Sequence, residues 1–226
     1  MPSDMREASK TAEVLGPSER SILVGNGIDI GCGRDPITPA VRRFDLDDGD
    51  ANAITNYVHE QFDFVFSSHC LEHMNDPRNA LHEWWKLVKP GGHLFFAVPD
   101  EDLYEQGVFP SQFNRDHKAT FTISKAQSWS PVSINVLDLA CSLPNAQLVS
   151  VMLQDHGYDR RLMKHGIVVP PWWVRFLYRA YKALQYRKLV GKLPVFETLK
   201  SRYLPVDQTL GAEALAQIQC IVKRLA

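Results

Sequence analysis

Cysteine pairs are missing from this chain. Its 226 residues include only four cysteines, and none of them forms a CxxC pair. The spacing therefore lacks the common zinc motifs and gives no disulfide framework, so the sequence predicts neither a bound metal ion nor disulfide bonds. Cysteine usage of this kind is typical of a reducing compartment.

Long apolar runs are also missing. No stretch approaches the roughly 20 apolar residues that cross a bilayer. The amino-terminal stretch MPSDMREASK is polar and has no apolar region of the kind found in secretory signals. We therefore expect a cytoplasmic protein.

The chain has almost no net charge, and the formal value of −1 does not favour nucleic-acid binding. The positive and negative charges are unevenly distributed along the chain. Residues 160–196 carry nine Lys or Arg and no acidic residue, while the remainder holds 16 basic and 26 acidic residues. Such a separation of charge predicts an anionic partner or an anionic surface for the basic segment.

Short apolar runs alternate with helical patterns, which predicts a parallel sheet covered on both faces. The expected strands are Gly27–Ile30, Phe62–Ser67, Leu94–Val98 and Gln147–Leu153. The expected helices are Ser3–Leu15, a helix opened by Asp76-Pro77 with Leu81, Trp84, Trp85 and Val88 on one face, and Val132–Cys141 behind Ser130-Pro131. The pattern of the last residues, 212–226, fits a helix slightly better than a strand.

A glycine turn follows the first strand in the sequence DIGCG. Gly31 and Gly33 allow the backbone to approach a ligand closely. Dinucleotide-binding turns have a third glycine, but Pro36 stands at that position here, so a pyrophosphate is not expected. A carboxylate that binds ribose should end the next strand, where Asp45 is the best placed and Asp47 is its rival.

Four segments in order resemble the class I S-adenosylmethionine-dependent methyltransferases of the broad "type 11" group: DIGCG, FDLDDGDA, FDFVFSSHCLEHMNDP and LVKPGGHLFFAVPD. The resemblance covers about residues 27–100. It implies an α/β, Rossmann-like fold whose seven-stranded sheet has the order 3-2-1-4-5-7-6, with the last strand antiparallel and helices on both faces. Residues 216–223 then become the last strand. Residues 1–226 are expected to form one methyltransferase domain.

The same resemblance implies an S-adenosylmethionine site at one edge of the sheet. Its glycines would pass under the methionine part, Asp29 would hold the amino group, Asp45 the ribose and Asp50 the adenine, and the end of the fourth strand would lie beside the sulfonium. The expected site comprises Asp29, Gly31, Cys32, Gly33, Asp45, Leu46, Asp50, Ala51, Ser68 and His69. Because only four residues separate the ribose and adenine acids, the third strand could be vestigial, and Asp47 or Asp48 could take one of these roles.

Transfer of a methyl group to a hydroxyl needs a group that removes the proton, and histidine suits this role near neutral pH. His117, in FNRDHKATF, is the first candidate for the base, with Asp100 and Tyr104 as orienting groups. His73, in LEH, is the second candidate for the base, although it could instead have a structural or supporting role. His69 could also be the base, or it could only flank the cofactor.

Residues 100–122 resemble a subset of these methyltransferases found with cell-surface polysaccharide genes. The chief hypothesis for function is therefore O-methylation of a sugar hydroxyl in glycan biosynthesis. The alternatives are N- or O-methylation of a small metabolite and a non-catalytic binding protein with the same fold.

Residues 157–211 form a basic, aromatic insert before the last strand, and Pro170-Pro171 is expected to open a helix within it. One predicted stripe is apolar and comprises Trp173, Phe176, Leu177, Ala180 and Leu184. The other comprises Arg175, Arg179, Lys182 and Tyr186. This helix could cover the sheet, form a homodimer face, bind an anionic substrate such as a nucleotide sugar, or contact a membrane peripherally through residues 170–192.

Overall fold

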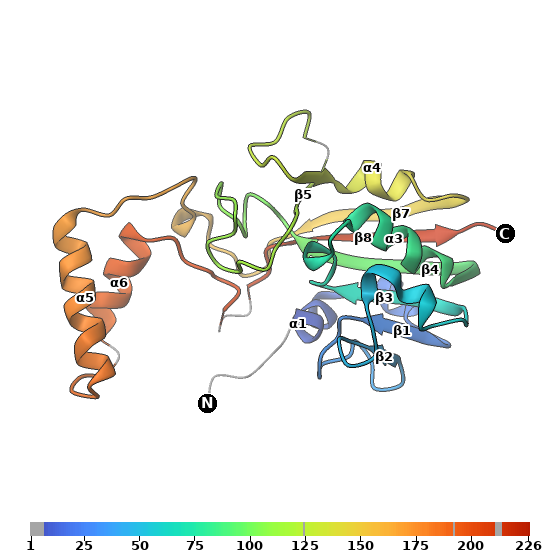
Figure 1. The fold of residues 1–226 in the computed structure, drawn as a ribbon, viewed down its shortest axis with the longest axis horizontal. Helices are drawn as coiled ribbons and strands as arrows, with labels where there is room; N and C mark the ends of the chain where they lie inside the picture. The colour runs from blue at the N-terminus through green and yellow to red at the C-terminus, as the bar shows by residue number, and fades with distance from the viewer. Residues whose placement is uncertain (1–6, 124, 192, 211–213) are drawn as a thin grey trace.

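A six-stranded sheet forms the centre of the computed structural model, which describes residues 7–123, 125–191, 193–210 and 214–226 (Figure 1). Its strand order is β2-β1-β3-β4-β8-β7. The strands are β1 (Gly27–Ile30), β2 (Arg42–Phe44), β3 (Phe62–Ser68), β4 (Val88–Pro99), β7 (Ala146–Gln154) and β8 (Gln217–Arg224). Strands β1 to β4 are parallel to one another, whereas β8 is antiparallel to both of its neighbours. The predicted α/β class and the antiparallel last strand are confirmed.

The predicted seventh strand, outside β2, is not formed. Between Phe44 and Phe62 the chain makes a turn and the 3-10 helix η1 (Ala51–Asn56). The run Asp-Leu-Asp-Asp-Gly-Asp over residues 45–50 favours turns, and too few residues remain for a crossover helix and another strand. The six observed strands otherwise follow the predicted order 3-2-1-4-5-7-6 without its edge strand, strand 3.

Helices cover both faces of the sheet. On one side lie α1 (Glu7–Val14) and α2 (Pro17–Ile22), and on the other lie α3 (Pro77–Lys86) and α4 (Val136–Cys141). Side chains of β3 alternate between the two cores: Phe64 and Phe66 face the α1 side, and Val65 faces the α3 side.

The helix starts test two capping predictions. Asp76 caps α3 as expected, and its carboxylate accepts hydrogen bonds from the backbone N–H groups of Arg78 and Asn79. The prediction for α4 was wrong, because this helix begins only at Val136. Its cap is Asn135, while the preceding residues form the short strand β6 (Ser133–Asn135). For the first predicted helix, residues 3–6 lie outside the described part of the chain.

A small second sheet fixes the segment that follows β4. Strand β5 (Thr120–Thr122) pairs in parallel with β6. The buried carboxylate of Glu101 ties this segment together, since it accepts hydrogen bonds from Thr120 and Ser133 and pairs with Lys125. The loop that leads into β5 carries His117 back toward the main sheet.

Between β7 and β8 the chain forms a helical arm that stands apart from the sheet (Figure 1). The arm contains the 3-10 turn η3 (Arg160–Leu162), α5 (Trp172–Tyr186) and α6 (Pro194–Tyr203). Tyr181 is buried between the two helices, and its ring stacks on Phe196 with a centroid distance of 4.1 Å. The helix α5 therefore packs on α6 and does not cover the sheet. Among the described helices, none is long and apolar enough to cross a membrane.

Candidate active site

The carboxyl ends of β1, β2, β3 and β4 meet at one edge of the sheet, where ligands of open α/β folds bind. The chain places β2 on one side of β1 and then β3 on the other, so the glycine turn after β1 lies at the point where the strand order reverses. Two cavities open there, of ≈ 190 Å³ and ≈ 180 Å³, and Gly31 lines both. Together they reach the lower end of the roughly 300–1,000 Å³ typical of small-molecule sites.

The glycine turn is held tightly against its neighbours. Gly31 has φ +77, and a Cβ added there would lie 2.5 Å from the Sγ atom of Cys70. Its N–H donates to the carbonyl of Phe44 at 2.8 Å. The N–H of Gly33 donates to the carboxylate of Asp45, which connects the turn to the end of β2. Glycine is therefore required at position 31 for both conformation and space.

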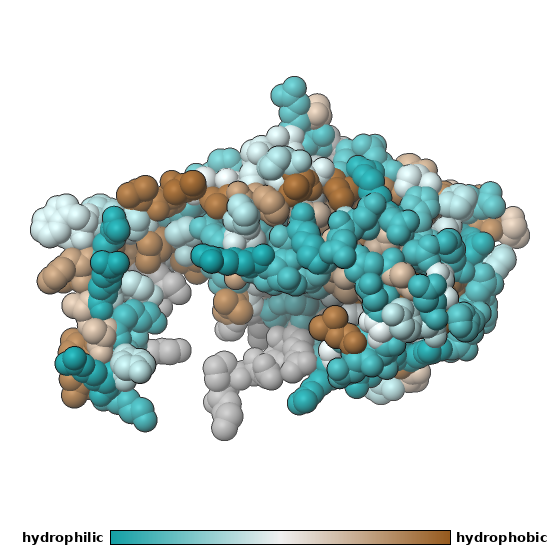
Figure 2. All heavy atoms as spheres, in the orientation of Figure 1, coloured by the Kyte–Doolittle hydropathy of each residue, from teal (hydrophilic) through white to brown (hydrophobic). Residues whose placement is uncertain are grey.

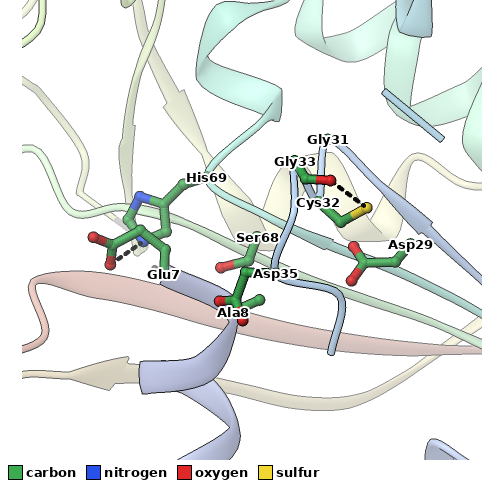
Figure 3. Close-up of a pocket in the computed structure, with 9 residues that line it drawn as sticks. All are labelled: Glu7, Ala8, Asp29, Gly31, Cys32, Gly33, Asp35, Ser68 and His69. Carbon is green, nitrogen blue, oxygen red and sulfur yellow. Dashed lines mark hydrogen bonds and ion pairs between the residues drawn. The ribbon is translucent and has the colours of Figure 1, made fainter. Parts of the chain in front are cut away.

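The first cavity lies beside Asp29, Cys32 and Ser68 (Figure 3). Asp29 is only 1% exposed, and its Oδ2 accepts the N–H of Ile37 at 2.7 Å. Its Oδ1 and the hydroxyl of Ser68 are buried without a hydrogen-bond partner among the described residues. Burial raises the pKa of Asp29 to about 8. A cation entering this cavity would meet an acceptor that has no other partner.

Helix α1 forms one wall of this cavity. Ser9 donates from both its N–H and its hydroxyl to the carboxylate of Asp35, which joins α1 to the segment after the glycine turn. Glu7 faces His69 across the cavity, with 3.8 Å between Glu7 Oε2 and His69 Nε2 (Figure 3). Glu7 could not be predicted from any local pattern, because this contact joins segments that are distant in the chain.

The second cavity lies beside Asp45, Asp50 and Ala51. The Oδ1 atom of Asp45 accepts the N–H of Leu46 at 2.7 Å, which still leaves lone pairs for a ligand hydroxyl. Asp50 caps η1, and its hydrogen bonds with the side chain and backbone of Asn52 hold its pKa below the usual value. The side chain of Leu46 is 89% exposed at the rim.

The two cavities suit the two ends of S-adenosylmethionine. The first offers a buried carboxylate with one unpartnered oxygen for an ammonium group, and the second offers the half-buried Asp45 and the exposed Asp50 carboxylates for hydroxyl and amine donors. Every residue predicted for the cofactor lines one of the two cavities.

Past the end of β3, three histidines surround one buried carboxylate. Glu72 is 1% exposed, and its Oε1 lies 3.5 Å from His69 Nδ1, 3.9 Å from His73 Nε2 and 3.9 Å from His117 Nε2. Burial opposes ionisation, but these three histidines hold the pKa of Glu72 below its usual value. The same carboxylate, together with Glu7, raises the pKa of His69 to about 9 despite burial.

Each of the two predicted catalytic histidines has a carboxylate partner. His117 is 5% exposed, and its Nδ1 lies 2.6 Å from Glu105 Oε1, while the ring of Tyr104 stacks on it. The Nδ1 atom of His73 lies 2.9 Å from Asp116 Oδ2.

Of the two orienting groups expected for His117, only one contacts its ring. Tyr104 contacts the ring of His117, as predicted. The carboxylate of Asp100 instead accepts the backbone N–H groups of Asp102 and Leu103, so it caps a turn. Glu105 takes the orienting position at His117.

Sequence reasoning missed three polar residues of this site. Glu72 stands inside the LEH motif but was not singled out, and Glu105 lies twelve residues before His117. Gln217, from the last strand, has its Oε1 2.8 Å from His69 Nε2. The LEH motif could have indicated Glu72, whereas no local sequence pattern indicates Glu105 or Gln217.

Residues 5–159 match the family model described as a methyltransferase domain. This match covers more than half of the chain, so the chain belongs to this methyltransferase family. This family depends on S-adenosylmethionine as its cofactor.

Among curated proteins, the chain is similar to ubiquinone biosynthesis O-methyltransferases. It is 40% identical over 93 residues to the protein from Pseudomonas entomophila (strain L48) and 38% identical over 93 residues to that from Pseudomonas putida (strain W619). Each match covers 37% of this chain and 40% of the relative, so the chain matches about two fifths of the length of these relatives.

Among solved structures, coclaurine N-methyltransferase bound to N-methylheliamine and SAH has a TM-score of 0.50 and 12% identity. The match covers 98% of this chain and 72% of that chain, and it supports the fold.

Proposed function

We propose that the protein transfers a methyl group to a hydroxyl at the edge of the sheet where Glu72 and its three histidines lie. When bound, S-adenosylmethionine supplies the electrophilic methyl group. Asp29 would hold the cofactor's amino end, Asp45 its ribose and Asp50 its adenine. The observation that carries the proposal is that His69, which lines the first cavity, shares the carboxylate of Glu72 with His73 and His117.

The acceptor oxygen must lose its proton, and the cluster contains the groups suited to this step. His117 is the first candidate because Glu105 fixes its Nδ1, so the opposite nitrogen has a defined orientation. His73 is the second candidate. Its ring is more exposed than that of His117, and it lines the cavity predicted for the ribose and adenine.

We propose a sugar hydroxyl of a cell-surface glycan as the acceptor, and the resemblance of residues 100–122 supports it. The relatives are named for O-methylation in ubiquinone biosynthesis, which favours oxygen over nitrogen as the methylated atom. A small metabolite remains the second candidate.

The experiment combines binding with turnover. We expect S-adenosylhomocysteine to bind the purified chain with micromolar affinity in calorimetry. We expect the cell's surface glycans to lose a methyl group, seen by mass spectrometry, when the protein is deleted. Unchanged glycans, with methylation of a small metabolite instead, would contradict the glycan acceptor.

Replacement of His117 tests the catalytic role. His117→Ala should lower turnover by about 100-fold or more while S-adenosylhomocysteine affinity stays nearly unchanged. His156→Ala is the control, since it removes an exposed histidine that lines neither cavity of the site. If His117→Ala keeps nearly full turnover, proton removal does not depend on His117 and His73 becomes the candidate.

We also propose that the helical arm contacts an anionic membrane. The predicted apolar stripe of α5 is exposed, with Phe176 67% exposed, and Figure 2 shows hydrophobic surface across this arm. Arg175, Arg179 and Lys182 lie on the other exposed flank. Helices with aromatic and basic flanks of this kind bind at the surface of anionic bilayers.

Vesicle flotation tests this contact. The chain should float with phosphatidylglycerol-rich vesicles more than with phosphatidylcholine vesicles, because each basic side chain near an anionic surface contributes about 1 kcal/mol. Phe176→Glu should reduce flotation, whereas Val24→Glu, at an exposed position far from the arm, should not. A concentration-dependent dimer that Phe176→Glu abolishes, without flotation, would show that this face is a homodimer interface instead.

A further inference from the structure

Glu72 is a buried carboxylate without a proper hydrogen-bond partner. Neither of its oxygens accepts a hydrogen bond from the described residues, although the side chain is 1% exposed. The nearest imidazole nitrogens stand 3.5–3.9 Å away, which is too far for a well-formed hydrogen bond. Buried carboxylates are normally hydrogen-bonded, paired or bound to a metal ion. The position of Glu72 therefore calls for a cation between it and the surrounding rings.

The two histidines of the proposed catalytic site face Glu72 in the same way. His117 has Glu105 at Nδ1, at 2.6 Å, and turns Nε2 toward Glu72. His73 has Asp116 at Nδ1, at 2.9 Å, and also turns Nε2 toward Glu72. A carboxylate on the far nitrogen is the arrangement that orients metal-binding histidines, because it fixes the tautomer and directs the free nitrogen at the metal.

The distances between these atoms suit a shared ion. One nitrogen from each of His73 and His117 and one oxygen of Glu72 all lie within 4.8 Å of one another. Bonds of about 2.1 Å to one tetrahedral ion place ligand atoms about 3.4 Å apart, so small side-chain shifts complete the geometry. His73 and Asp116 also line the open second cavity, which leaves one side of the ion accessible to another ligand.

We propose that Glu72, His73 and His117 bind one first-row divalent cation such as Zn²⁺. Two imidazoles and one carboxylate are the donor set of many zinc sites. The sequence has no cysteine spacing motif and did not predict such a site, because the ligands come from two distant segments, the 3-10 turn at residues 71–73 and the stretch before β5. One consequence rests on the proposed methyl transfer to a hydroxyl: an acceptor hydroxyl bound to the ion would pass its proton to solvent more readily, and His117 would then act as a ligand in place of the base proposed above.

Cobalt binding to the full, tag-free chain tests the site. After treatment with a chelator, the chain should bind one Co²⁺, seen as visible absorbance, and Zn²⁺ should displace it. Millimolar Mg²⁺ should not compete, because it prefers oxygen ligands. Glu105→Gln should weaken Co²⁺ binding by about 10–100-fold, the effect of losing a carboxylate behind a histidine ligand. Glu72→Gln should weaken it further.

His59→Gln is the matched control, since His59 is exposed and lines a separate cavity. Wild-type protein without stoichiometric Co²⁺ binding overturns the proposal, and so does binding that survives Glu72→Gln. If Glu72→Gln no longer unfolds cooperatively, His73→Ala replaces it as the test of Co²⁺ binding, because His73 is at a partly exposed position. Binding of S-adenosylhomocysteine without Co²⁺ would contradict only the metal site. Binding of Co²⁺ without S-adenosylhomocysteine would contradict only the cofactor proposal.

Discussion

The pH dependence of cofactor affinity should report the state of Asp29. Burial raises the pKa of this carboxyl to about 8 in the protein alone. If its ionised form holds the cofactor's ammonium group, binding below that pH must release a proton. At pH 6 about 1% of Asp29 would be ionised, so affinity should fall by about tenfold for each pH unit below 8.

The ligand contributes the opposite limb. Above its own pKa the amino group of the ligand loses the charge that the Asp29 carboxylate binds. Affinity for S-adenosylhomocysteine should therefore pass through a maximum between the pKa of Asp29, about 8, and that of the ligand's amino group. Binding should release nearly one proton at pH 6 and take up nearly one proton at pH 10.

Calorimetry from pH 6 to pH 10, in pairs of buffers with different ionisation heats, measures both the affinity and the proton count. Asp29→Asn should lower the affinity at pH 8 by about 10–100-fold, the scale of a charge-assisted hydrogen bond, and should abolish the acidic limb. Asp63→Asn, at an exposed carboxylate paired with Lys89, should change neither. A flat affinity between pH 6 and pH 8 with no proton release would refute the reasoning.

Two further substitutions test the cofactor cavity. Asp45→Ala should weaken S-adenosylhomocysteine binding by about tenfold or more in the same assay, whereas Asp47→Ala should leave it nearly unchanged; the reverse order would assign the ribose role to Asp47. Gly31→Ala should destabilise the fold by more than Gly91→Ala, because both have positive φ but only position 31 brings a Cβ against Cys70. Equal melting temperatures for the two variants would show that the turn relaxes.

The positions of the glycine turn and of its neighbouring acids could be predicted because the sequence signals for them are local. A glycine turn after a buried strand, followed by acids at the end of the next strand, fixes where Gly31 and Asp45 lie once the strands are parallel. The outer strand is missing because residues 45–61 are too few for another helix and strand, and they form only a turn and η1. The late start of α4 shows that a Ser-Pro signal loses to a better cap when the chain offers Asn135 five residues later.

The surroundings of the histidines could not be predicted in the same way. Gln217 reaches His69 across 148 residues, and only the pairing of β8 with β4 brings the two together. The contact of Glu105 with His117 depends on a loop that Glu101 anchors from inside the fold. The exposed stripe of α5 was predicted as a pattern, but the sequence could not show that Val174 and Tyr181 would be the buried residues.

Two buried carboxylates at the same edge of the sheet have pKa values shifted in opposite directions, and their surroundings explain why. Asp29 is buried with one backbone N–H and no nearby side-chain cation that outweighs burial, so its pKa rises. Glu72 is buried to the same extent, yet three imidazoles face it and its pKa falls. The charge that Asp29 lacks must arrive with a ligand, which matches the ammonium end of the cofactor. At Glu72 the imidazoles favour the ionised carboxylate, yet neither of its oxygens accepts a hydrogen bond from the described residues. Both carboxylates therefore leave a place for a cation, which we propose to be an ammonium group at Asp29 and a divalent ion at Glu72.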